Sequence, residues 1–173
     1  QTVVDLGSGA GNDCFVARQL VGDNGRVIGL DFTPAMIRKA QENAAKLGFT
    51  NVEFVRGEIE HMPLADGIAD VIVSNCVLNL VPDKRAAFAE MLRVLRPGGR
   101  FAVSDTVVRG AVPAEVRDVA ELHAGCISGA IDRDMYLALL KEVGFVDVVV
   151  RKERVHELSD VFLSAYLSAD QIR

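Results

Sequence analysis

Closely spaced glycines and one aspartate near the start of the chain could hold a nucleotide-like ligand. The run Val3-Val4-Asp5-Leu6-Gly7-Ser8-Gly9-Ala10-Gly11 joins an apolar segment to three glycines, and Asp31 ends a second apolar segment. Glycine lets the backbone approach a ligand closely. If both apolar segments are strands of a doubly wound sheet, their carboxyl ends are neighbours, and Asp31 can accept hydrogen bonds from both hydroxyls of a ribose. The pattern predicts an adenosine site.

The glycine spacing separates two kinds of adenosine ligand. Dinucleotide sites favour G-x-G-x-x-G, but here the third glycine is Gly11, and residue 12 is an asparagine. Asp5 would repel a pyrophosphate, whereas it suits a sulfonium or an ammonium group. The run is similar to the first motif of class I S-adenosylmethionine-dependent methyltransferases, and a plain strand-to-helix turn is the alternative. The cofactor contacts that we expect from it are Asp5, Gly7, Ser8, Gly9 and Asp31.

Residues 56–64, Arg-Gly-Glu-Ile-Glu-His-Met-Pro-Leu, resemble the segment with which these methyltransferases bind adenine. The resemblance implies that the backbone of Ile59 meets a ring nitrogen and that the Glu60 carboxylate accepts from the exocyclic amine. Met36 would pack on the adenine ring, a use that suits its polarisable sulfur. A core methionine is an equally good interpretation of Met36.

A second group of residues could hold the methyl acceptor. Residues 70–75 form an apolar run typical of a central parallel strand, and ligands lie beyond the carboxyl ends of such strands. We therefore expect Asn75 and Cys76 to face the reacting methyl group. Cys126 lies in the run Gly125-Cys126-Ile127-Ser128-Gly129-Ala130, within a segment, residues 106–131, expected to cover the substrate. Both thiols could converge on one pocket.

At this point the resemblance narrows to the arsenite methyltransferases. It rests on residues 5–14, 74–84 and 125–130 and spans nearly the whole chain. It implies that Cys76 and Cys126 bind trivalent arsenic, that the arsenic lone pair attacks the methyl carbon, and that a thiol reductant takes part. Arsenite methyltransferases carry further cysteines upstream of the first strand. Because this sequence starts at that strand, we expect a fragment that lacks an N-terminal segment.

Three alternatives stay open. Residues 95–100 also resemble quinone C-methyltransferases, so the acceptor could be a small organic molecule such as a quinone precursor. The shortened chain could instead bind arsenite or the cofactor without catalysis. A dinucleotide-dependent reductase is disfavoured by Asn12 and by the strand pattern at the C-terminus.

Strands and helices are predicted to alternate along the chain. This order predicts an α/β fold: a Rossmann-like three-layer sandwich with a mostly parallel sheet, closed by a C-terminal antiparallel hairpin. The predicted strands lie at 3–6, 27–31, 51–56, 70–75, 101–104, 146–155 and 161–168. For 161–168 a helix is the alternative. The predicted helices follow Gly11 and cover 34–47, 84–95, 113–126 and 133–143, and the buried stripe of the third of these five comprises Phe88, Met91, Leu92 and Leu95.

Length and composition narrow the class of protein. The 173 residues suffice for a single domain, 1–173, with a sizeable core. Lysine and arginine total 19 against 24 acidic residues, a net charge of −5 without a basic stripe, which argues against a nucleic-acid partner. No apolar run predicts a membrane span. Cys14, Cys76 and Cys126 form no C-x-x-C pair, which indicates thiols in a reducing, cytoplasmic compartment, with Cys14 in the core.

Overall fold

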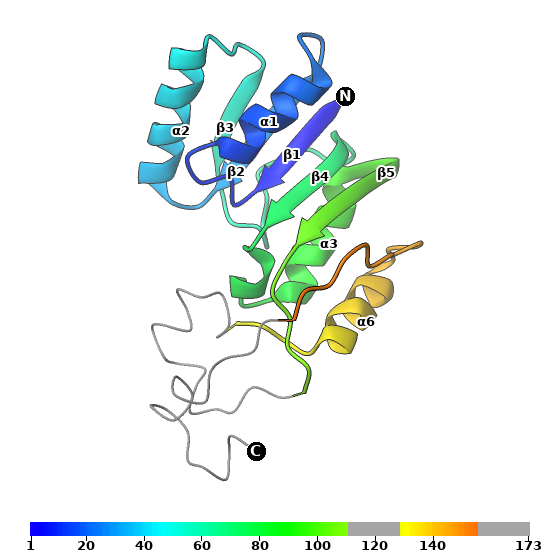
Figure 1. Ribbon diagram of the computed structural model, residues 1–173. Coiled ribbons are helices and arrows are strands. Elements are labelled where there is room, and N and C mark those ends of the chain that lie inside the picture. Colours follow the sequence, from blue (N-terminus) through cyan, green and yellow to red (C-terminus); the bar gives the residue numbers. More distant parts are fainter. Residues whose placement is uncertain (111–128, 156–173) are drawn as a thin grey trace, which may run out of the picture.

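The computed structural model describes residues 1–110 and 129–155 and contains a twisted sheet of five parallel strands (Figure 1). The strand order is β3-β2-β1-β4-β5. Every neighbouring pair is parallel, so the carboxyl ends of all five strands lie at the same edge. The strands are β1 Thr2–Leu6, β2 Arg26–Asp31, β3 Val52–Arg56, β4 Ala69–Asn75 and β5 Leu95–Ser104.

The helices begin and end at the residues that local capping chemistry selects. Thr33 precedes Pro34 at the start of α2, and Gly48 ends that helix in a left-handed conformation. Asp83 caps α3 by accepting the Ala86 N–H, and Asp132 caps α6. The described helices are α1 Asn12–Val21, α2 Pro34–Leu47, the short 3-10 helix η1 Leu78–Leu80, α3 Lys84–Val94 and α6 Arg133–Val143.

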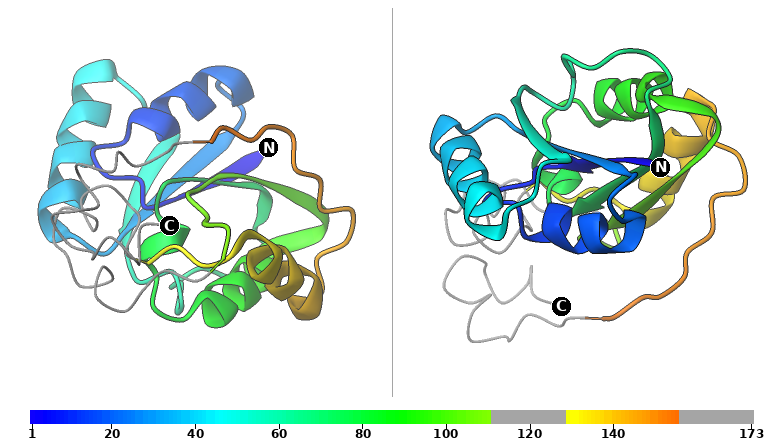
Figure 2. Two further views of the ribbon diagram at one scale, coloured as in Figure 1. Left: turned by 60° about the horizontal axis from the view of Figure 1, so that its bottom comes forward. Right: turned by 90° about the horizontal axis from the view of Figure 1, so that it is seen from above.

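Two apolar clusters fix helices to the two faces of the sheet (Figure 2). On one face Cys14 and Ala17 of α1 pack against Val3 and Val27. On the opposite face α3 and α6 cover β1, β2 and β4, with Phe88 fully buried. Cys14 is fully buried as well, which confirms its predicted place in the core. The layered α/β architecture predicted from the element order is confirmed.

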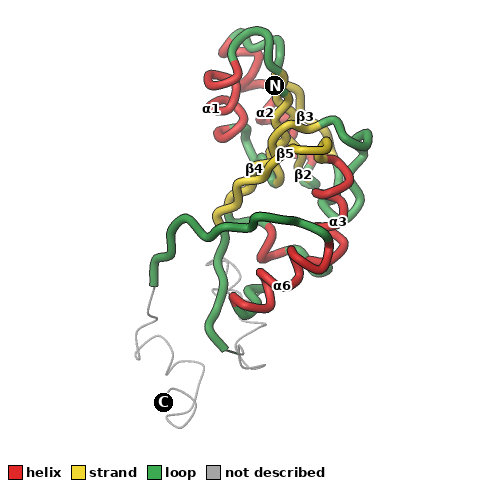
Figure 3. Tube along the Cα trace, turned by 90° about the vertical axis from the view of Figure 1, so that its right-hand side faces the viewer, coloured by secondary structure: helices red, strands yellow, loops and turns green. Residues whose placement is uncertain are grey.

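The predicted strand at 146–155 is wrong. These residues follow α6 as a loop without strand pairing (Figure 3). Their valines favour a strand, but a strand also needs a neighbour to bond with. Val146 and Val155 are instead 80% and 74% exposed. The other half of the predicted hairpin, 161–168, and the predicted helix at 113–126 lie outside the described residues.

Two smaller predictions about the third helix also need correction. Leu92 is 38% exposed rather than part of the buried stripe, and Leu95 belongs to β5. This strand starts earlier than predicted, because Leu95 already pairs with Ala69. An irregularity in the register at residues 96–99 then precedes the pairing of Val71 with Arg100.

The described residues just before and just after 111–128 are hydrogen-bonded to each other. The Val108 N–H donates to the Ile131 carbonyl at 3.1 Å, and the Arg133 N–H donates to the Val108 carbonyl at 2.9 Å. The Asp132 carboxylate also accepts the Gly110 N–H at 2.9 Å. Among the helices that the structure describes, none is long and apolar enough to cross a membrane.

Candidate active site

Asp31 joins the loops that follow β1 and β2 at the carboxyl edge of the sheet. Its Oδ2 accepts the Gly9 N–H at 2.9 Å, and its Oδ1 accepts the Thr33 N–H at 2.8 Å. The Asp31 carbonyl accepts the Gly57 N–H from the loop after β3 at 3.1 Å. Three loops therefore meet at this one residue. Its carboxylate oxygens keep further lone pairs for ligand hydroxyls.

The glycine loop over β1 is shaped by two different requirements. Gly7 has φ 68° and lies against Val77, so a Cβ there would come within 2.3 Å of a Val77 methyl carbon. Gly9 has φ 52°, and a Cβ there would meet no atom within 4 Å. Between them, the Ser8 hydroxyl oxygen is buried without a hydrogen-bond partner. The loop thus combines open space with an unsatisfied polar atom, as expected where a ligand is received.

Asp5 lies beneath this loop, and the residue is 2% exposed. Its Oδ2 accepts a hydrogen bond from the Cys14 thiol at 3.2 Å. Burial, reinforced by the nearby charges of Asp13 and Asp31, raises the pKa of Asp5 to about 7. Burial likewise raises the pKa of the Cys14 thiol, which keeps it protonated as a donor.

The loop after β3 carries the predicted adenine contacts. Ile59 is buried and Glu60 is half-buried, while Met36 on α2 is 44% exposed, so the core interpretation of Met36 is wrong. The loop is tied to α3: Glu90 accepts the Met62 N–H at 2.8 Å, and Arg93 donates to the Leu64 carbonyl at 2.8 Å and the Met62 carbonyl at 3.0 Å.

Cys76 follows directly after β4, where the sequence places it. It is exposed and adopts φ 53°, a left-handed conformation that is rare outside glycine. Its N–H donates to the Ser104 carbonyl at the end of β5 at 2.8 Å. Asn75 beside it is also exposed. Cys126 lies outside the described residues, and among those that are described no group of three metal-ligating side chains occurs.

Two charged residues near the turn that follows Cys76, Lys84 and Asp105, were not predicted from the sequence. Lys84, 8% exposed, donates to the Asn79 carbonyl at 3.0 Å and the Val81 carbonyl at 3.1 Å. Asp105 accepts the Tyr136 hydroxyl at 3.2 Å and the Thr106 N–H at 3.1 Å.

Burial governs the ionisation of these side chains. It lowers the pKa of Lys84, with Asp105 and Glu60 opposing that shift, and it raises the pKa of Asp105 to about 6. It also raises the pKa of Tyr136, so the phenol stays a donor. The position of Asp105 just beyond a strand end was a usable signal, whereas nothing marked Lys84.

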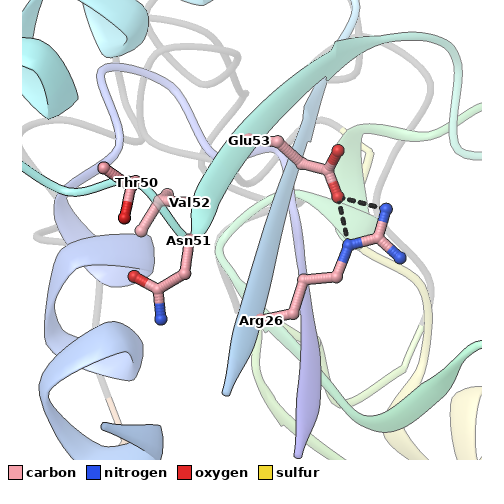
Figure 4. A pocket seen from close by; sticks show the side chains of 5 residues that line it. All are labelled: Arg26, Thr50, Asn51, Val52 and Glu53. Atoms are coloured by element: carbon pink, nitrogen blue, oxygen red, sulfur yellow. Dashed lines mark hydrogen bonds and ion pairs between the residues drawn. The ribbon is translucent and has the colours of Figure 1, made fainter. Parts of the chain in front are cut away.

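A pocket of about 240 Å³ lies at the other end of the sheet, where β2 and β3 begin (Figure 4). Arg26 and Glu53 pair across it at 2.5 Å, and the remaining lining residues are Thr50, Asn51 and Val52. Since the predicted site residues collect at the carboxyl ends of the strands, this pocket is separate from them.

Comparison with known proteins gives consistent matches. Residues 1–158 match the family described as methyltransferase domain. The chain is 49% identical over 162 residues to the arsenite methyltransferase of Halobacterium salinarum, covering 92% of this chain and 41% of that protein. It is 39% identical over 104 residues to a ubiquinone/menaquinone biosynthesis C-methyltransferase of Klebsiella pneumoniae, covering 60% of this chain and 41% of the relative.

A solved structure agrees with the sequence matches. The chain superposes with a TM-score of 0.76 and 40% identity on the crystal structure of CrArsM, an arsenic(III) S-adenosylmethionine methyltransferase from Chlamydomonas reinhardtii. The match covers 84% of this chain and 52% of that one. The chain thus spans about half the length, or less, of the relatives that it matches.

Proposed function

The chain belongs to the methyltransferase domain family, and from this premise we propose that it transfers a methyl group from S-adenosylmethionine to trivalent arsenic. The observation that carries the proposal is the exposed Cys76, held in a left-handed turn at the carboxyl end of β4, beside the loop that would receive the cofactor. The identity with arsenite methyltransferases supports the choice of acceptor.

The residues at the sheet edge fit S-adenosylmethionine. Space above Gly9 and the unpartnered Ser8 hydroxyl suit the amino-acid part of the cofactor, and Asp31 offers oxygens to the ribose hydroxyls. We assign the adenine to Ile59, Glu60 and the exposed Met36. When bound, the cofactor supplies an electrophilic methyl carbon on a sulfonium. Asp5 and Gly7 complete the set, with Asp5 placing a carboxyl group below the loop.

Cys76 and Cys126 are proposed as the thiolates that hold arsenic, because soft thiolate ligands suit a soft thiophilic ion. Gly129 supports their convergence: a Cβ there would lie 2.2 Å from the Asn79 carbonyl oxygen, so Gly129 packs directly on the turn after Cys76. Cys126 precedes Gly129 by three residues, and three residues span at most about 11 Å. Cys126 therefore has the reach to share one ion with Cys76.

The two thiolates would orient the arsenic lone pair toward the methyl carbon, with Asn75 at the rim of the same edge. No general base is needed once arsenic is bound as a thiolate complex. Methyl transfer to the lone pair oxidises arsenic, so a thiol reductant is proposed as a further partner that returns it to the trivalent state. Residues 106–131 are proposed to cover this substrate.

A small organic acceptor is the second candidate. The 39% identity over 104 residues with a ubiquinone/menaquinone biosynthesis C-methyltransferase favours it. The cysteines separate the two candidates, because a carbon acceptor needs no thiolate ligand.

The deciding experiment incubates the chain with arsenite, S-adenosylmethionine and a thiol, and measures methylated arsenic by mass spectrometry. Cys76→Ser and Cys126→Ser should each abolish methylated arsenic while cofactor binding persists. Cys14→Ser is the matched control, since a buried hydroxyl can still donate to Asp5. Undiminished arsenic methylation in Cys76→Ser would remove arsenic coordination from the proposal. Cofactor binding without any methylated arsenic in the unaltered chain would favour the organic acceptor or a binding role.

A further inference from the structure

The turn that follows Cys76 is flanked by two charged side chains, those of Lys84 at the start of α3 and of Asp105 just beyond β5. A left-handed non-glycine residue is strained and persists only where its surroundings over-determine it. The Cys76 N–H donates to the Ser104 carbonyl of β5, and this bond fixes the start of the turn. The rest of the turn, including η1, contains Asn79, which is fully buried.

Lys84 holds the turn through its carbonyl groups. Its ammonium donates to the carbonyls of Asn79 and Val81 at 3.0 and 3.1 Å, and the residue is 8% exposed although it stands at the start of α3. Burying an ammonium is unfavourable unless it is well bonded. Both hydrogen bonds of Lys84 go to carbonyl groups of the backbone segment that connects Cys76 to α3.

Asp105 holds the same residue from its other side. Its carboxylate accepts the Thr106 N–H at 3.1 Å and the Tyr136 hydroxyl at 3.2 Å. The nearby backbone N–H of Asn79 opposes the rise of the Asp105 pKa, which places the carboxylate beside that N–H. Lys84 thus binds the Asn79 carbonyl, Asp105 lies beside the N–H of the same residue, and the opposite charges of Lys84 and Asp105 attract. Tyr136 is on α6, and its ring centroid lies 5.1 Å from that of Phe88 on α3, so Tyr136 connects Asp105 to both helices.

Gly129 closes the third side of the turn. Because a Cβ at this position would come within 2.2 Å of the Asn79 carbonyl oxygen and 3.3 Å of the Leu80 Cα, glycine alone fits. Backbone atoms at such distances cannot move aside as a flexible side chain would.

We propose that Lys84 and Asp105 are positioning residues that clamp Asn79 and thereby fix the placement of Cys76 for the transfer reaction. The inference rests on the proposed function in assigning Cys76 to the acceptor. It goes beyond that function in making two residues that touch neither acceptor nor cofactor determine where the thiolate points.

The test uses Asp105→Asn and Lys84→Met in the full chain. An amide offers one acceptor oxygen where the carboxylate has two, and Thr106 and Tyr136 each bond a different oxygen, so one of these two donors loses its partner. Methionine keeps the apolar stem of lysine. Hydrogen exchange at the Cys76 and Asn79 amides should quicken at least about tenfold in both variants, because a local bond is lost. Exchange at Ile72 in the middle of β4 should stay unchanged.

Kinetics supply the readout that a purely structural role would not give. A thiolate misplaced by about 1 Å is expected to lower kcat for arsenite about 100-fold. The KM for S-adenosylmethionine should stay within about twofold, because the cofactor loops are untouched. Arg85→Met is the matched control: Arg85 neighbours Lys84 but makes an exposed ion pair with Glu142, and its loss should change neither readout.

Each outcome decides the proposal. Unchanged exchange at Cys76, equal quickening at Ile72, or an unaltered kcat in the folded variants would overturn it. If either variant fails to fold, Tyr136→Phe, which removes only the hydroxyl bonded to Asp105, must quicken exchange at Asn79, and no change there would overturn it too. If the unaltered chain leaves arsenite unmethylated, the proposed function fails, while the exchange data still decide whether the clamp fixes Cys76.

Discussion

The buried carboxyl group of Asp5 takes its hydrogen bond from the Cys14 thiol, at 3.2 Å, beneath the glycine loop. A thiol is a weak donor, so it compensates poorly for the loss of water around an ionised carboxylate. Asp5 is therefore a destabilising residue at neutral pH in the absence of a ligand, in a position where a cationic ligand group would change its ionisation.

The stability of the protein should depend on pH through Asp5. Its pKa rises from 3.8 to about 7 on folding, so its stabilising contribution is complete below about pH 4 and is lost as pH rises through 7. Asp5→Asn removes this loss and should raise the free energy of unfolding at pH 8, by up to about 4 kcal/mol. Urea titrations at pH 4, 6 and 8 measure the difference. Glu42→Gln, an exposed carboxylate on α2, is the control, and parallel profiles for Asp5→Asn and the unaltered chain would contradict the prediction.

Binding of S-adenosylmethionine should release protons below neutral pH. A positively charged cofactor favours the ionised form of Asp5, so affinity should rise roughly tenfold per pH unit up to about pH 7 and then level off. Isothermal calorimetry in buffers of different ionisation enthalpy measures both the affinity and the protons released. In Asp5→Asn the pH dependence should disappear. A cofactor affinity that is flat from pH 5 to 8 in the unaltered chain would show that Asp5 is not coupled to the ligand.

Two glycines of the same loop should respond differently to alanine. Gly7→Ala places a methyl group against Val77 in addition to backbone strain, which should destabilise the fold by about 3 kcal/mol. Gly9→Ala meets open space, so it should destabilise less and chiefly weaken cofactor binding. Thermal unfolding and calorimetry compare the two. Val77→Ala should partly rescue Gly7→Ala, and the absence of any rescue would argue against the contact as the cause.

Arg93 should control the affinity for the adenine end of the cofactor. It donates to two carbonyls of the loop after β3, and it keeps Glu90 ionised by holding the pKa of that carboxyl below its ordinary value. Arg93→Met should raise the Kd of S-adenosylmethionine about tenfold, since hydrogen bonds to charged groups contribute about 1.5–3 kcal/mol. Lys39→Met, at an exposed position of α2, is the control. Equal affinities for S-adenosylmethionine in the two variants would contradict the prediction that Arg93 supports cofactor binding through this loop.

Local signals in the sequence were sufficient for much of the fold. The bounds of α2 and α6 match their predictions because Pro34, Gly48, Asp132 and Gly144 start and stop helices through neighbouring backbone groups. The loop at 146–155 was mispredicted because strand formation depends on a partner that the valine pattern does not specify.

In the candidate site too, residues with local sequence signals were predicted, and residues that act only after tertiary packing were not. Asp31 and Gly9 were identified from their spacing, and their direct hydrogen bond agrees with it. Lys84, Asp105 and Arg93 were missed, because each acts on backbone groups that lie near it only after the sheet and α3 have packed. Nothing in the residues flanking Lys84 distinguishes it from a solvated lysine.

The bonds between Val108 and residues 131 and 133 join the two described stretches that flank residues 111–128. The free energy of closing a connection between two points rises slowly with its length, and doubling the length of a flexible connection adds only about 0.6 kcal/mol. A chimera in which another methyltransferase's segment is placed between Gly110 and Gly129 would keep the bonds of Val108 to residues 131 and 133 at its two junctions.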